Sequence, residues 1–151
     1  MSIHPTAVID AKAELDGAVE IGPYVVIEGR VKIGRGTRVR AHAYLTGWTE
    51  IGEDNEIHPG AVLGNAAQDR ASKGEESYLR IGSHNIIREY AQIHRGTTAG
   101  SETRIGNHNF LMAQRMWGTI ASSATTSSWP TAHCWGAMSK LAITFSSRAT
   151  V

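Results

Sequence analysis

Two short segments carry the side chains best suited to bind a polar ligand. The first, GNAAQD (64–69), ends in Asp69, and Lys73 follows four residues later. The second, IHRGT (93–97), contains His94. A carboxylate accepts hydrogen bonds from hydroxyl groups, and an imidazole can donate one to a phosphate or sugar oxygen. On residue type alone, however, a solvated loop carboxylate and an outward-facing histidine are the simpler interpretation.

The histidines do not form a recognisable metal-binding pattern. Three histidines each follow an aliphatic residue of a six-residue repeat in the sequence: His4, His58 and His94. We therefore expect them at comparable outer positions. A zinc site needs three or four ligands that converge on one point. His84 and His108 lie at other offsets and do not complete such a set. We therefore expect no metal ion.

A six-residue repeat supplies the elements that must position these side chains. Of 19 positions spaced six apart from residue 3 to residue 111, 16 are Ile, Leu or Val, and the exceptions are Asp69, Glu75 and Ala99. Small or β-branched residues mostly stand four positions later, and glycine often stands one position later. This period fits neither an amphipathic helix nor one long strand. It is typical of a parallel β-helix, in which three hexapeptides make one triangular coil.

The prediction is therefore an all-β fold of roughly six coils over residues 1–114. An irregular β-sandwich is the alternative, and the eleven consecutive in-phase aliphatic residues from Ile3 to Leu63 make it a poor fit. The repeat is interrupted after Leu63 and resumes at Ile81. We interpret residues 64–80 as a loop inserted into the solenoid, and such insertions often carry the binding face.

Composition separates residues 1–114 from residues 115–151. The first segment holds all 14 acidic and 12 of the 15 basic residues, whereas the tail has no acidic residue and 13 Ser/Thr. The net charge of +1 gives no reason to expect a nucleic-acid partner. No secretory signal or apolar membrane span is visible, and the single cysteine, Cys134, excludes an internal disulfide. We expect a soluble cytoplasmic protein.

The segments GNAAQD (64–69), KGE (73–75) and IGSHNIIREYAQIHRGT (81–97) go beyond a generic hexapeptide repeat. Together with the opening IHPTAVID, they resemble the UDP-N-acetylglucosamine O-acyltransferase family of lipid A biosynthesis, over residues 1 to about 114. The resemblance implies a left-handed parallel β-helix, a homotrimer with active sites between subunits, and the cytoplasm of a Gram-negative type bacterium. The implied reaction moves a 3-hydroxyacyl chain from acyl carrier protein to the 3-hydroxyl of UDP-N-acetylglucosamine. No cofactor is implied.

The resemblance also assigns roles to three residues. It implies that Asp69 and His94 contact the sugar nucleotide. The family usually has a lysine two residues after the aspartate, where this chain has Ala71. Lys73 is the nearest lysine and is the weaker candidate for that anchor. Arg88 and Arg95 either meet pyrophosphate or the acidic carrier protein, or are solvated outer side chains.

The family's catalytic residue is missing. Its general base is a histidine in an H-D-C segment shortly after a run like NFLMA, and it removes the proton from the attacking sugar hydroxyl. Here NFLMAQ (109–114) is followed by RMWGTIASSATT, and the family position falls at Thr119. A threonine hydroxyl cannot act as a base at neutral pH. The sequence therefore predicts no catalytic residue and an inactive chain.

The genetic code suggests that the tail is frameshifted. If one nucleotide was lost after Gln114, the single codons of Met and Trp force valine across Met116–Trp117 and leucine across Cys134–Trp135. With the free wobble bases chosen to suit, the shifted frame restores H-D-C and all six repeat positions of the tail. The alternative is a genuine divergent tail. In either case we expect residues 115–151 to be poorly ordered and the solenoid to be truncated, without the family's later coils and helical domain.

Two classes of function remain open for the chain as it stands. It is a member of an acyltransferase family by fold, or a non-catalytic β-helix fragment. A third interpretation makes it a divergent hexapeptide transferase that uses His94 as its base.

Overall fold

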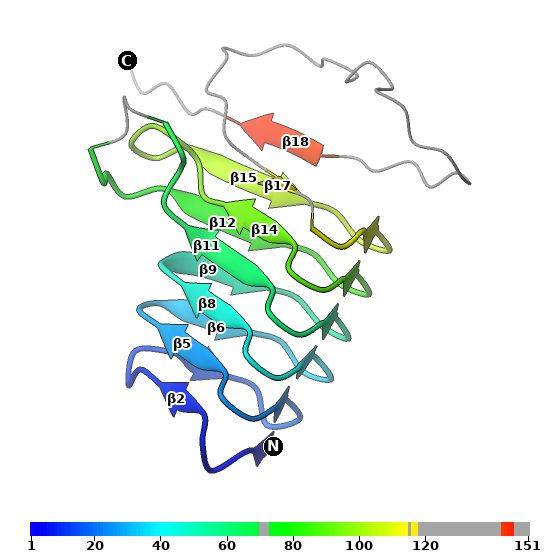
Figure 1. Ribbon diagram of the computed structural model, residues 1–151. Helices are drawn as coiled ribbons and strands as arrows, with labels where there is room; N and C mark the ends of the chain where they lie inside the picture. The colour runs from blue at the N-terminus through cyan, green and yellow to red at the C-terminus, as the bar shows by residue number, and fades with distance from the viewer. Residues whose placement is uncertain (70–72, 115, 118–142, 147–151) are drawn as a thin grey trace.

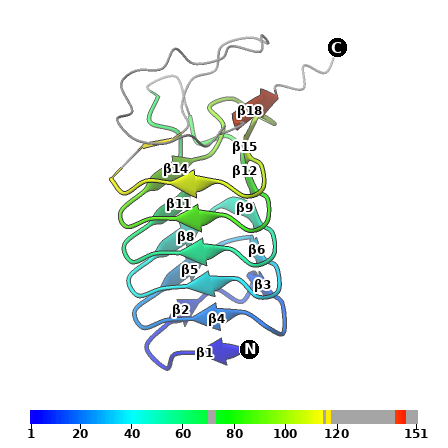
Figure 2. The same cartoon turned by 90° about the vertical axis from the view of Figure 1, so that its right-hand side faces the viewer.

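The computed structural model describes residues 1–69, 73–114, 116–117 and 143–146. Its strands form three parallel sheets, which are the three faces of a triangular solenoid (Figures 1 and 2). Consecutive strands in the chain belong to different sheets, and each strand pairs with the strand of the next coil. The chain is a left-handed parallel β-helix, as predicted.

The strands are two to four residues long. The first sheet contains β1 (Ser2–Ile3), β4 (Glu20–Ile21), β7 (Arg38–Val39), β10 (Glu56–Ile57), β13 (Ile86–Ile87) and β16 (Phe110–Leu111). The second contains β2 (Val8–Ile9), β5 (Val26–Glu28), β8 (Tyr44–Thr46), β11 (Val62–Asn65), β14 (Gln92–His94) and β17 (Met116–Trp117). The third contains β3 (Glu14–Leu15), β6 (Val31–Ile33), β9 (Trp48–Ile51), β12 (Tyr78–Ile81), β15 (Glu102–Ile105) and β18 (Ile143–Ser146).

The repeat positions build the core. Aliphatic side chains one coil apart stack on each other, as in the register pairs Ile21–Val39 and Leu45–Leu63. From Ile21 to Leu111, the aliphatic residues of the repeat are at most 4% exposed. The small residues four positions later are buried as well, including Val25, Ala43 and Ala61. Each coil therefore buries its inner face only against its neighbours, as expected for a solenoid.

Two excursions from the solenoid explain the interruptions of the repeat. In a regular coil the register partners are three hexapeptides apart, as in Glu14–Lys32. Tyr78 instead pairs with Trp48, which stands five hexapeptides earlier, and with Glu102, which stands four hexapeptides later. The coil between Trp48 and Tyr78 thus contains two extra hexapeptides, and the coil between Tyr78 and Glu102 contains one. Because both insertions are whole hexapeptides, the six-residue phase continues unchanged after each. The described residues therefore form five complete coils and the start of a sixth, rather than six.

The first excursion is shorter than the predicted loop, because strands occupy both of its ends. β11 extends to Asn65 and β12 begins at Tyr78, so the connection covers residues 66–77. The second excursion, residues 95–101, leaves the same corner one coil later. The sequence predicts only the first of these two excursions.

The predicted tail lies mostly outside the described residues. β17 pairs with β14 in the parallel register of the repeat, with Trp117 opposite Ile93. β18 pairs with β15 in antiparallel orientation, unlike every other strand pair of the described residues. In the described part of the chain, no helix could span a membrane.

Candidate functional site

His94 lies where both excursions leave the second sheet. It is the last residue of β14, and Asn65, its register partner, is the last residue of β11. The pairing shifts by one residue between Leu63 and Asn65, which is a β-bulge. Bulges re-aim side chains near the edges of sheets. This bulge places the start of the first excursion against the end of β14.

The side chain of His94 is buried by this excursion. It is 1% exposed, and its Nδ1 lies 2.9 Å from the carbonyl oxygen of Ala66. Because a carbonyl oxygen only accepts hydrogen bonds, Nδ1 carries the proton in this contact. The Nε2 atom of the neutral ring then has a free lone pair. The sequence predicts an outer position for His94, next to Ile93; in the structure the excursion covers its side chain.

The HRGT segment, residues 94–97, contains several buried polar atoms without a protein partner. Within the described residues, the buried side-chain atoms that make no hydrogen bond are His94 Nε2, Arg95 Nε and Thr97 Oγ1. Leaving a polar atom buried and unpaired costs about 1–3 kcal/mol. Three such atoms in four consecutive residues call for partners that the protein does not supply, such as ordered water, an ion or a ligand.

Arg95 is not a solvated outer arginine. Its guanidinium carbon lies 5.0 Å from the ring centroid of Trp48, in a cation–π contact. Its backbone N–H donates to the Asn65 carbonyl at 3.0 Å. Burial lowers the pKa of Arg95 from its ordinary value, and no carboxylate forms an ion pair with it in the described residues. Arg88 differs, because its Nε lies 3.0 Å from Glu89 Oε2.

The other two predicted binding residues lie in the first excursion. Asp69 is half-buried and has a partner of its own, and it follows Ala66, the contact of His94, by three residues. Lys73 is exposed, and its backbone N–H donates to Glu75 Oε2 at 2.9 Å. The described contacts thus join the start of this loop to His94, and they do not join Lys73 to it.

Sequence reasoning missed Trp48 as a neighbour of the HRGT segment. The signal was present, because Trp48 stands three hexapeptides after Arg30 and six hexapeptides after Lys12. Residues at that spacing share one corner of the solenoid. No cluster of three His, Cys, Asp or Glu side chains suited to a metal ion occurs in the ranges that the structure describes.

Comparison with known proteins connects this geometry to a family. The model of the bacterial transferase hexapeptide (six repeats) matches residues 13–47 and 30–65. The acyl-[acyl-carrier-protein]–UDP-N-acetylglucosamine O-acyltransferase of Thermodesulfovibrio yellowstonii is 50% identical over 112 residues, which cover 74% of this chain and 43% of the relative. This chain belongs to the UDP-N-acetylglucosamine O-acyltransferase family, and the match covers about three quarters of its length.

Solved structures agree with this assignment. The UDP-N-acetylglucosamine O-acyltransferase of Moraxella catarrhalis matches with a TM-score of 0.75 and 42% identity, over 78% of this chain and 46% of that one. The corresponding protein of Acinetobacter baumannii matches with a TM-score of 0.73 and 45% identity, over 76% and 45% of the two chains. The chain therefore spans less than half the length of the relatives that it matches.

Proposed function

We propose that residues 1 to about 114 are the sugar-nucleotide-binding part of an acyltransferase scaffold. The substrate is UDP-N-acetylglucosamine, and His94 contacts it through Nε2. The observation that supports this proposal is the buried Nε2 atom, which lacks a partner while Nδ1 is held by the Ala66 carbonyl. In the neutral ring, Nε2 accepts a hydrogen bond from a hydroxyl or amide N–H of the substrate.

In the reaction of this family, the 3-hydroxyl oxygen of the sugar attacks the thioester carbon of the acyl carrier protein. The C–S bond breaks, the thiol takes up a proton, and the hydroxyl proton must pass to a general base. The family's base lies in an H-D-C segment that this chain does not contain, and Thr119 stands in its place. We propose that this chain binds the sugar nucleotide without transferring the acyl group. Asp69 is a second contact of the substrate, and Lys73 a weaker one.

The same proposal includes the family's partners. Acyl carrier protein is the acyl donor in the relatives' reaction, and the family resemblance implies a homotrimer with active sites between subunits. The names of the relatives support the donor and the acceptor.

Isothermal titration calorimetry of the full chain with UDP-N-acetylglucosamine tests the binding proposal. We expect His94→Ala to weaken binding at least about ten-fold, since it removes a buried hydrogen-bonding group. His4→Ala is the matched control, because His4 also follows an aliphatic repeat residue but is exposed. Circular dichroism confirms that both variants keep the β-helix. Undetectable binding by the unmodified chain, or equal affinity of His94→Ala, would contradict the proposal.

A second candidate function is acyl transfer with His94 itself as the base. The contact of Nδ1 with the Ala66 carbonyl favours it, because a general base needs an unprotonated nitrogen and Nε2 is that nitrogen in the neutral ring. A transfer assay separates the two candidates.

A further inference from the structure

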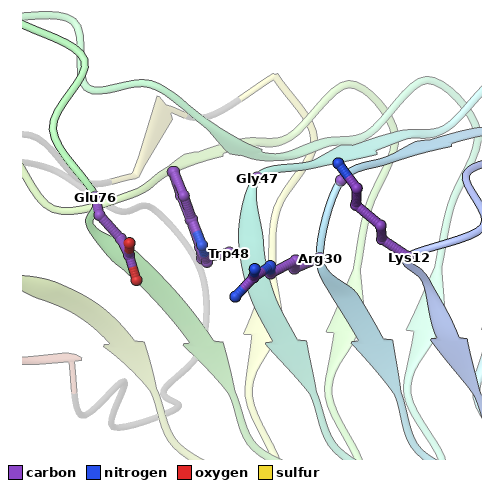
Figure 3. Close-up of a pocket in the computed structure, with 6 residues that line it drawn as sticks. Lys12, Arg30, Gly47, Trp48 and Glu76 are labelled. Carbon is purple, nitrogen blue, oxygen red and sulfur yellow. The ribbon is translucent and has the colours of Figure 1, made fainter.

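A groove lies on the corner between the second and third sheets, the corner from which both excursions leave. It has a volume of about 300 Å³ and is lined by Lys12, Gly29, Arg30, Gly47, Trp48 and Glu76. Figure 3 shows the labelled side chains in a row across neighbouring coils, with Arg30 between Trp48 and Lys12. The volume is at the lower end of the range of small-molecule sites.

The repeat places these side chains in one column. The register pairs Glu14–Lys32 and Val31–Thr49 put Lys12, Arg30 and Trp48 at equivalent positions of three successive coils. Neighbouring parallel strands are about 4.8 Å apart, so the two cations originate one strand spacing from each other. A single anionic group can therefore reach both of them.

The cations of the groove are not neutralised by ion pairs. Among the described residues, no carboxylate lies within ion-pair distance of Lys12 or Arg30. Asp10, which stands two residues before Lys12, accepts backbone hydrogen bonds: its Oδ1 accepts from the Lys12 N–H at 2.9 Å, and its Oδ2 accepts from the Gly29 N–H at 3.2 Å.

Glu76 is the one acidic side chain that lines the groove, and its Oε1 accepts a hydrogen bond from the hydroxyl of Tyr78. A third cation, which has no ion pair among the described residues, lies behind the lining. The guanidinium of Arg95 packs against Trp48, and its Nη1 is so close to Gly47 that a Cβ there would lie 2.3 Å from it. Around the groove lie the cations Lys12, Arg30 and Arg95 and the carboxylates Asp10 and Glu76, and this excess of cations favours an anionic ligand.

We propose that this groove binds a small molecule that carries both a phosphate group and a flat ring. Arg30 and Lys12 bind the phosphate, since guanidinium and ammonium groups form charge-assisted hydrogen bonds with phosphate oxygens. The ring lies against the indole of Trp48, which stacks with any flat π-system. Glu76 accepts a hydrogen bond from a hydroxyl or amino group of the ligand. This site does not depend on the binding of UDP-N-acetylglucosamine at His94.

Calorimetry of the full chain with adenosine 5′-monophosphate tests the proposal, with inorganic phosphate and glucose 6-phosphate as parallel probes. We expect adenosine 5′-monophosphate to bind most tightly and its affinity to fall as salt is raised. Arg30→Gln should weaken its binding at least about five-fold, and the double variant Lys12→Gln/Arg30→Gln further. Trp48→Phe should reduce the preference over inorganic phosphate.

Arg38→Gln is the matched control, because it removes the same charge from an exposed position on β7, in the first sheet. It should leave the affinity for adenosine 5′-monophosphate unchanged. The proposal is overturned if none of the three probes binds, if the groove variants bind as tightly as the unmodified chain, or if Arg38→Gln weakens binding as much as Arg30→Gln.

Discussion

At the scale of single residues, position in the repeat does not determine solvent exposure. His4 and His94 occupy the same position relative to an aliphatic repeat residue, yet His4 is exposed and His94 is 1% exposed. The difference has two sources: the excursion places Ala66 against His94, whereas His4 lies in the first coil, where even the repeat residue Ile3 is 41% exposed. A residue's environment in this solenoid therefore depends on the loops that cover it as well as on its phase.

Charge pairs between coils should make stability depend on pH. The guanidinium of Arg40 donates to Glu56 Oε1 at 2.9 Å and lowers the pKa of Glu56. A lowered pKa in the folded state contributes stability above the unfolded pKa of about 4.3 and loses it as pH falls through the folded value. We expect Arg40→Gln to reduce the free energy of unfolding at pH 7 by at most about 1 kcal/mol, since the pair is partly exposed.

Urea unfolding at pH 7 and at a pH below the folded pKa of Glu56 measures this effect. The cost of Arg40→Gln should disappear at the acidic pH. In a Glu56→Gln background, Arg40→Gln should change the free energy of unfolding by the same amount at both pH values. A cost of the same size at both pH values would show that Arg40 acts through packing rather than through Glu56.

At the scale of elements, buried asparagines join successive coils at one corner. Asn85 Nδ2 donates to Asn55 Oδ1 at 3.0 Å, and Asn109 Nδ2 donates to Asn85 Oδ1 at 2.9 Å. The backbone N–H groups of Asn85 and Asn109 donate to the same oxygens at 2.9 and 2.8 Å. Each side chain thus satisfies donors of the next coil, in a position where the other coils place small or β-branched residues.

Replacing the middle asparagine should break this ladder. Asn85→Ala removes the acceptor of two buried donors, and each donor left unpaired costs about 1–3 kcal/mol. We expect a loss of about 2–4 kcal/mol in the free energy of unfolding, measured with urea. The control is Asn107→Ala, because Asn107 is exposed and accepts only the Ser83 N–H at 2.7 Å. Equal losses in the two variants would contradict a role for the ladder.

The glycines that follow the repeat residues allow the coils to approach closely. A Cβ on Gly52 would lie 2.7 Å from the Gly82 carbonyl oxygen, whereas a Cβ on Gly17 would meet nothing within 4 Å. We expect Gly52→Ala to lower the melting temperature clearly, because the contact is with backbone. Gly17→Ala should leave it unchanged or raise it slightly. Similar melting temperatures for both variants would contradict this explanation of the glycines that follow the repeat residues.

The sequence could predict the solenoid because its period fixes which side chains point inward. Ile21, Leu45 and Leu111 are buried as that period requires. It could not predict the number of coils, because insertions of whole hexapeptides leave the phase unchanged and look like regular repeats. The burial of His94 and Arg95 depends on how the excursions fold back, which no local pattern indicates. The corner groove also contains Glu76 from the first excursion, and no spacing in the repeat places that residue beside Lys12, Arg30 and Trp48.

At the scale of the whole molecule, the chain carries less than half of the length of its relatives. The matched segments of 112 and 114 residues have about the length of the repeat segment, residues 1–114. The proposed frameshift after Gln114 fits this boundary. The structure of residues 118–142 and 147–151 lies outside the described residues.

Resequencing the gene across codons 109–125 from independent DNA tests the frameshift. We expect an extra nucleotide after the codon of Gln114, which would restore the H-D-C segment and make the natural protein a longer acyltransferase. An unchanged sequence, with codons for Ser123 and Ser147 that begin with AG, would support a genuine divergent tail. Such a chain would lack the family's catalytic histidine.

We propose that this chain carries the binding part of an acyltransferase without its catalytic base. The most direct test is an acyl-transfer assay of the purified 151-residue chain, with a 3-hydroxyacyl thioester of acyl carrier protein and UDP-N-acetylglucosamine. We expect no transfer above the uncatalysed rate. Transfer that is abolished in His94→Ala and retained in His4→Ala would contradict the claim and establish His94 as the base.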